Sequence, residues 1–515
     1  MDRTGAEGHG RTPARRTRPA RERARSSAGA AEKLIAGVPA RIMRPRIVFI
    51  ACLAALVVFG LVMVYSASSV VALKEEGDAT YYLFRQAIFA VIGLGLIAVM
   101  TSKMLSWSWI LDNLIWPVWA IMILVLVAVK VMGLAGGGAV RWIAIGPFTL
   151  QPSEFMKPVI IVLAANIMSD YYERESISTS QFLLRLAIAV VAPLFLIFIQ
   201  PDMGTTLIIA VTVFAMAFFA GISYRIVFGA VLLAVLLVAA AIVVAPYRME
   251  RLLAMSDPWA DPFDTGYQAT LAIMAFASGG LFGRGIGNST MKYDYLPESH
   301  NDYIFAIIGE ELGFVGSVIF VLVFVAMTWA AFSIAKQARC LRDRLIAEGC
   351  AVIIMVQFLI NALGILNVIP MTGKTMPFIS YGGSSLIASL ILAGLVVRVS
   401  FESGTETVYR SRRADFAVMD DTDEVSSHLG RSTAGEPQVR QAASERRSGF
   451  SVVDGWRSSS SQGGAQRGAR TRRSPESGPY DRVDLHGGAA DRLRERDGSP
   501  RGGRRGSSRR DRYDR

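Results

Sequence analysis

The chain has 515 residues, of which 52% are hydrophobic and 19% charged, and its mean hydropathy is +0.39. Soluble domains carry about 25% charged residues, so this composition excludes an ordinary soluble globular protein. The net charge of +12 belongs to the two ends, because residues 1–46 carry +8 and residues 399–515 carry +5, which leaves residues 47–398 at −1. The basic balance therefore does not predict a nucleic-acid-binding core.

The two tails have compositions that disfavour folding. Residues 1–46 are rich in Arg, Pro and Gly, and residues 401–515 are rich in Ser, Gly and Arg. Neither tail can bury enough apolar surface to offset its conformational entropy, so both are predicted to be disordered. A solvated tail, attraction to anionic inner-leaflet lipids and docking of a partner all fit these compositions. RNA binding is disfavoured because stacking aromatic residues are scarce.

Between the tails, apolar runs of about 18 or more residues predict membrane-spanning helices. Ten are predicted, over residues 47–67, 82–100, 113–132, 153–169, 184–200, 204–221, 225–246, 303–335, 346–368 and 380–398. The eighth is longer than a bilayer needs and is expected to tilt or to project beyond the membrane. The predicted fold class is an all-α integral membrane protein with about ten transmembrane helices, and its membrane domain covers residues 47–400.

Basic residues indicate the orientation of this domain. They gather before the first span, in the 336–344 loop and after the last span, namely Arg41, Arg44, Arg46, Lys336, Arg339, Arg342, Arg344, Arg398, Arg410, Arg412 and Arg413. Because Lys and Arg are enriched in cytoplasmic loops, both tails are predicted to be cytoplasmic. The longest outward loop is then 247–302, between helices 7 and 8. Its 267–282 segment is short and apolar, which favours a helix lying in the interface or folded back on the bundle.

Charged groups within a membrane bundle are costly, so each one requires a physical reason. Most of the prominent polar residues lie on the outward side: Arg141, Trp142, Gln151, Ser153, Glu154, Lys157, Asp202, Asp257, Asp261, Asp264, Glu298, His300, Asp302 and Lys374. Gathering on one side predicts a site that acts on a substrate presented at the outer membrane face.

Three titratable residues, Glu298, His300 and Asp302, precede the eighth span. Asp302 fits a helix-start carboxylate stabilised by the helix dipole, with Asn301 or Ser299 as an alternative N-cap. His300 fits a base, a ligand or a structural turn residue. A metal site formed by the three is conceivable from the residue types, although their spacing matches no strong metal motif.

Two further carboxylates, Glu310 and Glu311, lie within the same span. Because the two point in different directions on a helix, at least one must face protein or water. Pairing with other side chains inside the protein is the favoured interpretation.

Two basic residues, Arg141 and Lys157, admit two interpretations. Each could pair with Glu154 or Asp202. Alternatively, they could bind an anion, because Arg offers a bidentate fork to phosphate and Lys a mobile point charge.

Seven stretches carry motifs that occur in this order along the chain: MVYSASS (63–69), GGAVRWIAIGPFTLQPSEFMK (137–157), QPDMGT (200–205), DPWADPFDTGYQ (257–268), SGGLFGRGIGNS (278–289), YLPESHNDYIFAIIGEELGFVG (295–316) and PFISYGGSS (377–385). Together they resemble the SEDS family, the FtsW/RodA/SpoVE-like peptidoglycan polymerases, from about residue 45 to 400. The segment PESHNDYIFAIIGEELG is closer to FtsW than to RodA. Two departures are visible: the family's H-T-D reads His300-Asn301-Asp302, and its T-K-G reads Thr372-Gly373-Lys374.

The resemblance implies a ten-helix glycosyltransferase that acts on lipid II, the undecaprenyl-pyrophosphate-linked disaccharide pentapeptide. It also implies that Asp302, the acidic residue of the P-E-x-H-x-D motif, is catalytic. A carboxylate there can take the proton of the attacking sugar hydroxyl as a general base. One attacking hydroxyl, without an enzyme nucleophile, implies inversion at the anomeric carbon.

The leaving group of that reaction is a lipid pyrophosphate, so cations should stabilise its developing charge. The candidates are Arg141, Lys157, Lys374 or a bound divalent ion such as Mg or Mn, and no organic cofactor is implied. Glu154, Glu298 and His300 complete the predicted substrate-binding group. Glu298 is interpreted as a supporting carboxylate and His300 as a residue that shapes the turn.

The implied location is the cytoplasmic membrane of a bacterium, with cell division or elongation as the process. The implied partners are a class B penicillin-binding protein, other divisome or elongasome proteins and the membrane itself, without nucleic acid. Two other functions stay open at this point. One is a lipid II flippase, although no internal repeat of broken helices is evident. The other is a membrane scaffold of the division machinery that recruits partners through its tails.

Overall fold

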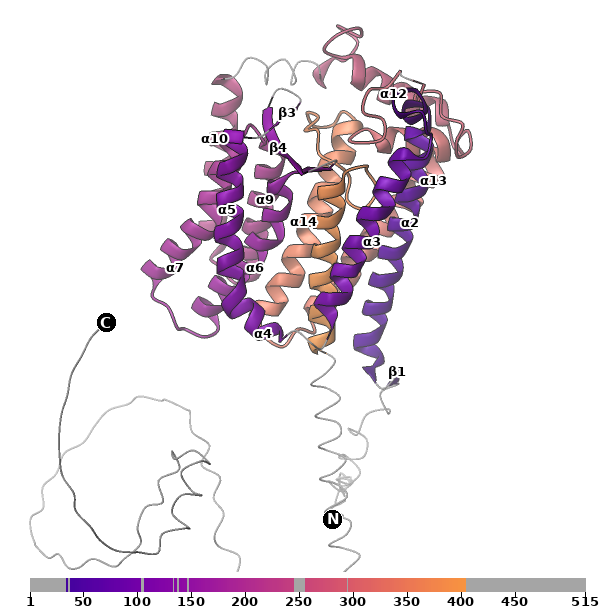
Figure 1. Cartoon of the computed structure of the whole chain (residues 1–515). Coiled ribbons are helices and arrows are strands. Elements are labelled where there is room, and N and C mark those ends of the chain that lie inside the picture. The colour runs from indigo at the N-terminus through magenta and orange to yellow at the C-terminus, as the bar shows by residue number, and fades with distance from the viewer. Residues whose placement is uncertain are drawn as a thin grey trace, which may run out of the picture. The chain divides into compact units, whose positions relative to one another are not determined.

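The structure is a computed structural model. It describes residues 34–35, 38–102, 106–132, 134–136, 139–145, 148–244, 255–293 and 295–403. Within these residues the protein is a bundle of long helices that carries short strands and loops at its ends (Figure 1). Most of both tails lies outside the described residues, so their predicted disorder stays a prediction.

Each of the ten predicted apolar stretches forms helix. In chain order they are α2 (Ala40–Glu76), α3 (Tyr81–Thr101), α4 with η1 and α5 (Trp107–Trp109, Ile110–Leu114 and Ile115–Met132), α6 (Pro152–Tyr172), α7 with η2 and α8 (Thr179–Leu186, Ala187–Val191 and Ala192–Ile199), α9 (Met203–Phe219), α10 (Tyr224–Val244), α13 (Ile304–Ala335), α14 (Leu341–Ile365) and a final helix, Gly383–Ser403. The structure confirms the predicted fold class of a multi-pass helical membrane protein.

Seven of the helices in the described part of the chain are long and apolar enough to cross a membrane. Helix α9 and the apolar start of α10 are shorter. Most side chains of helix α6 are buried against neighbouring helices, as are most of those of α14 and the final helix. A helix surrounded by protein can carry charged residues such as Glu154 and Lys157, because protein groups rather than lipid surround them.

The first and last helices of the described region meet at one end of the bundle. Arg46 on α2 donates from Nε to Ser400 Oγ at 2.8 Å and from Nη2 to the Ser400 carbonyl at 2.5 Å. Its guanidinium also lies 4.3 Å from the centre of the Phe401 ring. Helix α2 therefore begins at Ala40, seven residues before the predicted start, because Arg46 has partners inside the protein and is not a tail residue.

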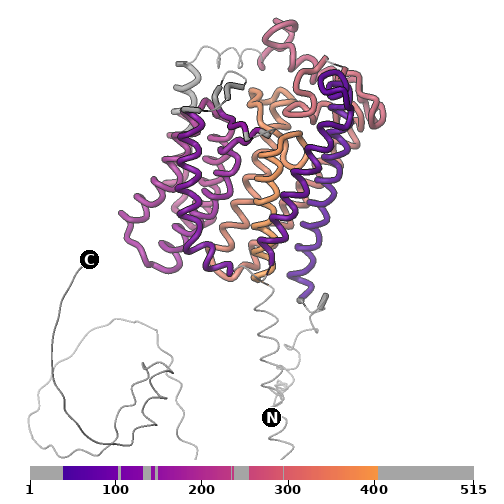
Figure 2. The backbone as a smooth tube through the Cα atoms, in the orientation of Figure 1, coloured from indigo at the N-terminus to yellow at the C-terminus, as the bar shows by residue number. Residues whose placement is uncertain are grey.

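The opposite end of the bundle carries the irregular structure that the sequence places outward (Figures 1 and 2). A small antiparallel sheet with strand order β3-β4-β5 (Leu134–Gly136, Ala139–Ile145 and Phe148–Leu150) lies there. Its register places Trp142 opposite Leu134 and Ala144 opposite Thr149. The other short ladder, β1-β2 (Leu34–Ile35 and Val38–Pro39), precedes α2. Neither ladder is predicted from the sequence.

Helix α12 (Tyr267–Gly279) in the outer segment packs against α13. The ring centres of Phe276 and Phe305 are 5.4 Å apart, and a side chain at Gly279 would collide with the Gly309 carbonyl. The prediction that this segment folds back on the bundle is confirmed.

Helix α13 is broken at Gly313, where φ is +67°. The chain that follows α12 satisfies the backbone groups released by the break. The Phe314 and Val315 amides donate to the Gly280 and Leu281 carbonyls at 2.9 and 3.0 Å. In return, the Arg284 amide donates to the Glu310 carbonyl at 3.1 Å. The outer segment is thereby hydrogen-bonded into the wall of the bundle.

Glu310 and Glu311 are both fully buried, and both have partners from other segments. Glu310 accepts from Ser289 Oγ at 2.5 Å and from Thr290 Oγ1 at 2.6 Å. Glu311 accepts from Ser66 Oγ on α2 at 2.6 Å. The favoured interpretation of internal pairing is confirmed for both carboxylates.

Candidate functional site

Asp302 lies at the entrance to α13 but outside the helix. The N-cap of α13 is Tyr303, and its side chain makes no capping hydrogen bond. The N-cap interpretation of Asn301 or Ser299 is therefore wrong, because the chain turns once more before the helix begins. Asp302 immediately precedes the N-cap, next to the start of the helix. Asp302 is partly exposed, and its Oδ2 lies 3.4 Å from the point where a Cβ on Gly373 would sit. The carboxylate thus lies against the 366–382 loop.

An ion pair lies beside that loop. Lys374 Nζ is 2.7 Å from Asp202 Oδ1, and both side chains are buried. Asp202 is the N-cap of α9, and its Oδ1 also accepts from the Thr205 amide at 3.1 Å. Gly204 has no side chain and so leaves room for Lys374, because a Cβ at this position would lie 2.7 Å from Lys374 Cγ. This first turn of α9 therefore holds the aspartate and admits its cation.

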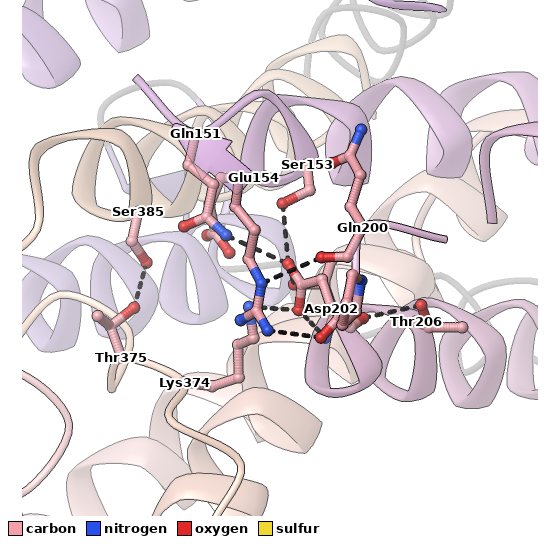
Figure 3. Close-up of polar contacts among 12 residues, drawn as sticks. Gln151, Ser153, Glu154, Gln200, Asp202, Thr206, Lys374, Thr375 and Ser385 are labelled. Atoms are coloured by element: carbon pink, nitrogen blue, oxygen red, sulfur yellow. Dashed lines mark hydrogen bonds and ion pairs between the residues drawn. The ribbon is translucent and has the colours of Figure 1, made fainter. Parts of the chain in front are cut away.

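The second carboxylate oxygen of Asp202 connects the pair to α6. It accepts from Gln151 Nε2 at 3.2 Å and from Ser153 Oγ at 3.1 Å (Figure 3). Burial by itself would raise the pKa of Asp202, but Lys374, the Thr205 amide and Arg141 lower it to about 2. Asp202 is therefore an ionised structural carboxylate and not a proton carrier at neutral pH.

A second buried ion pair lies on α6. Lys157 Nζ is 2.6 Å from Glu154 Oε2 and 2.7 Å from Gln357 Oε1 on α14. Lys157 and Glu154 are 1% and 2% exposed. The pairing interpretation of Lys157 holds in this structure, and the burial of both side chains leaves them no surface with which to contact a substrate.

Arg141 on β4 differs from both lysines. Its Nε donates to the Gln200 carbonyl at 3.2 Å and its Nη2 to the Pro201 carbonyl at 2.6 Å. These partners are neutral, and the side chain is partly exposed. Among the predicted basic residues, Arg141 therefore has the geometry best suited to receive an anion from solvent.

Glu298 and His300 point to different surroundings. Glu298 is exposed, has a positive φ of 56°, and accepts a hydrogen bond from Asn301 Nδ2. The His300 ring packs against Tyr82 and Tyr381, with ring centres at 4.8 and 5.7 Å. Burial lowers the pKa of His300, although Glu298 and Glu75 act in the opposite direction. The histidine is thus a neutral, aromatic-packed turn residue.

These positions do not fit a metal site made from Glu298, His300 and Asp302. The part of the chain that the structure describes holds no group of three or more His, Cys, Asp or Glu residues able to bind an ion. Instead, His300 packs against Tyr82 and Tyr381, and Glu298 accepts a hydrogen bond from Asn301. A divalent ion held by other ligands stays a prediction, which chelation of the assay buffer would test.

An apolar groove of about 550 Å³ lies between α9 and α10. Phe218, near the end of α9, lines it together with Phe228 on α10. The rise of an α-helix places Phe218 about 20 Å along the axis from Thr205. The groove therefore lies far from the Asp202–Lys374 pair, and it does not serve that site.

Known proteins resemble this chain over most of its helical region. Residues 46–405 match the model of the FtsW/RodA/SpoVE family, described as cell cycle protein. The chain belongs to this family. One relative, the probable peptidoglycan glycosyltransferase FtsW of Trichlorobacter lovleyi, is 36% identical over 370 residues, which cover 70% of this chain and 94% of that protein. Stage V sporulation protein E of Bacillus subtilis is 37% identical over 349 residues, 67% of this chain and 94% of that protein.

Two solved structures are also similar. A chain from a peptidoglycan synthase complex that coordinates polymerization and crosslinking has a TM-score of 0.57 and 29% identity, covering 69% of this chain and 98% of that chain. The rod shape determining protein RodA of Thermus thermophilus has a TM-score of 0.51 and 26% identity, covering 69% of this chain and 96% of that chain. The helical fold is therefore that of the FtsW/RodA/SpoVE family.

Two amide residues beside the site, Gln357 and Asn361, are not predicted from the sequence. Both are buried on α14 and hydrogen-bond the 366–382 loop. The available signal is their spacing, since two amides four residues apart lie on one helix face and need polar partners within a membrane bundle. Charged residues on the outward side give a stronger signal than two uncharged amides inside a predicted span, so the sequence does not predict a role for Gln357 and Asn361.

Gly204→Ala is expected to destabilise the protein by about 1–3 kcal/mol, the usual range for overpacking a core site. Alanine favours helix over glycine by about 1 kcal/mol, so a net loss would show that the collision with Lys374 outweighs propensity. Gly95→Ala on α3 is the control, because nothing lies within 4 Å of its Cβ position. Thermal unfolding in detergent measures both. A Gly204→Ala variant as stable as Gly95→Ala would contradict the close approach.

Proposed function

We propose that this protein is a peptidoglycan glycosyltransferase that polymerises lipid II at the outer face of the bacterial cytoplasmic membrane, with Asp302 as general base. Membership of the FtsW/RodA/SpoVE family supports the activity. The observation that carries the site assignment is the position of Asp302. It is a partly exposed carboxylate just before the N-cap of α13, and it lies against a loop that holds a buried lysine.

The reaction requires one proton transfer and one bond exchange. The acceptor sugar hydroxyl attacks the anomeric carbon of the donor, and its proton passes to the Asp302 carboxylate. The bond between that carbon and the pyrophosphate oxygen breaks, and its electron pair leaves with the pyrophosphate. Attack opposite the leaving group inverts the anomeric carbon, because the enzyme supplies no nucleophile.

Three basic residues are candidates for stabilising the charge of the leaving pyrophosphate. Lys374 and Lys157 are neutralised by Asp202 and Glu154, so their role is to hold the loop and α6 in place. Arg141 is the residue that contacts the leaving pyrophosphate, because its described partners are carbonyls and it reaches the surface. This assignment narrows the predicted substrate-binding set from three cations to one.

The proposed setting follows from orientation and from relatives. Basic residues gather at the end of the bundle where Arg46 hydrogen-bonds Ser400. Because Lys and Arg are enriched in cytoplasmic loops, they support a cytoplasmic location for both termini. A class B penicillin-binding protein is the proposed partner, to cross-link the strands, and the similarity to a chain of a synthase complex supports it. Cell division or elongation is the process served.

Purified protein with its class B penicillin-binding partner should convert labelled lipid II into glycan chains in detergent, where no membrane separates two compartments. Gel separation of the chains measures the product. The absence of chains, combined with movement of labelled lipid across liposomes that contain the protein, would contradict the proposal and favour a flippase. A third arm removes residues 404–515. Lost polymerisation in that arm would show that the tail, and not only the helical domain, is needed.

A further inference from the structure

Two buried amides on one face of α14 hold consecutive residues of the 366–382 loop. Asn361 Nδ2 donates to the Lys374 carbonyl at 2.6 Å, and Gln357 Nε2 donates to the Thr375 carbonyl at 2.9 Å. Their four-residue spacing places the two side chains one above the other on the helix. The loop is thereby fixed in register against α14.

The Asn361 amide also reaches a second segment. Its Nδ2 donates to the Asp302 carbonyl at 2.7 Å, so one nitrogen connects the chain before α13 with the loop after α14. The side chain is completely buried. Its Oδ1 has no hydrogen-bond partner among the described residues. A buried acceptor without a partner lowers the stability of the folded protein. The position therefore uses the two N–H donors of asparagine, at a cost in stability.

The loop backbone at this point lies directly against the Asp302 carboxylate. Gly373 has a φ of +63°, and its Cβ position is 3.4 Å from Asp302 Oδ2. Asp302 precedes the N-cap of α13, so regular helix geometry does not orient it. The orientation of the carboxylate therefore depends on where the backbone at Asp302 and at Lys374 is held.

We propose that Asn361 is the positioning residue of the base: its amide holds the Asp302 backbone and the Lys374 backbone at a fixed separation. It keeps the carboxylate against the backbone at Gly373. This inference rests on the proposed polymerase function and adds a residue that does not contact the reacting atoms.

Asn361→Ala should lower kcat for glycan polymerisation by about 10- to 100-fold, since misplacing a catalytic group by about 1 Å can cost 10²-fold. KM for lipid II should change less than about twofold, because substrate contacts are retained. Asn166→Ala is the matched control. Asn166 Nδ2 makes the same kind of bond, to the Leu111 carbonyl at 2.8 Å, and its Oδ1 is likewise without a described partner. This control should keep wild-type kcat and KM.

Asn361→Asp separates positioning from general loosening. An ionised aspartate faces two carbonyls without a donor, whereas a protonated one can donate to one of them, and burial favours protonation. The activity of Asn361→Asp relative to wild type should therefore rise as pH falls, while the relative activity of Asn361→Ala stays flat.

The outcomes divide cleanly. If wild type polymerises and Asn361→Ala matches Asn166→Ala, the positioning role is wrong and the proposed function stands. A raised KM with unchanged kcat, or a flat pH ratio for Asn361→Asp, also overturns the positioning role. A wild-type protein that makes no glycan would instead overturn the proposed function. Thermal midpoints of all variants identify a loss of activity that comes only from unfolding.

Discussion

Asp302→Asn is expected to lower the rate of glycan polymerisation by about 10²- to 10⁴-fold, the usual contribution of a general base. The amide has nearly the shape of the carboxylate but cannot accept the hydroxyl proton. Stability should change little, because the side chain neither caps α13 nor lies fully buried. Turnover of labelled lipid II and thermal unfolding, measured on one preparation, test both statements.

Asp170→Asn supplies the matched control for this substitution. Asp170 is a partly exposed carboxylate near the other end of α6, with Arg174 Nη1 at 3.1 Å. Surface ion pairs contribute about 0–1 kcal/mol, so the control should retain stability and turnover. Glycan synthesis by Asp302→Asn at the rate of Asp170→Asn would refute the base assignment. Activity lost with a collapsed thermal midpoint would make Asp302 structural instead.

Lys374→Met should destabilise the folded protein by about 3–5 kcal/mol, because it leaves Asp202 charged and buried without its cation. The expected loss exceeds that of Gly204→Ala, which displaces the lysine but does not remove it. The double variant Lys374→Met with Asp202→Asn should recover much of the loss, since neither residue is then charged. Thermal midpoints in detergent measure the three proteins. Equal midpoints for the single and double variants would argue against the pair.

Acid provides a second test of the same pair. The folded pKa of Asp202, about 2, is lower than its ordinary value of 3.8. A depressed carboxylate pKa adds stability that is present above pH 3.8 and is lost as pH falls toward 2. Wild type should therefore lose stability over this window. The double variant lacks the carboxylate and should show a smaller loss, and an identical acid profile for both would contradict the assigned pKa.

The helices were predictable because a membrane imposes a strong pattern. Only long apolar runs satisfy backbone and side chains together in lipid, so ten stretches can be located from the sequence, although α2 runs from Ala40 to Glu76 and exceeds the predicted 47–67 at both ends. The start of α2 at Ala40 was missed because Arg41, Arg44 and Arg46 read as tail residues. Arg46 belongs to the helix, because its guanidinium donates a hydrogen bond to Ser400 and lies over the Phe401 ring.

Within the site, the sequence by itself determined which residues were candidates, through charges that a membrane protein does not carry without a reason. It singled out Asp302 and Arg141 as candidates, Asp302 through the family motif, and it predicted the internal pairing of Glu310 and Glu311. Pairing between segments distant in sequence was decided by the tertiary structure. Hydrophobic patterning has no information about which of several lysines meets which carboxylate.

The tertiary structure therefore assigned Lys374 to Asp202, brought Gln357 of α14 to the local Lys157–Glu154 pair, and separated Glu298 and His300 from Asp302. It also showed that Asn361 joins residues 302 and 374, whose carbonyls come together only when α14 packs beside both segments. Burial and hydrogen-bond geometry are properties of packed helices. The residue types in a sequence indicate that buried polar groups need partners, but the packing of the helices determines which partners they have.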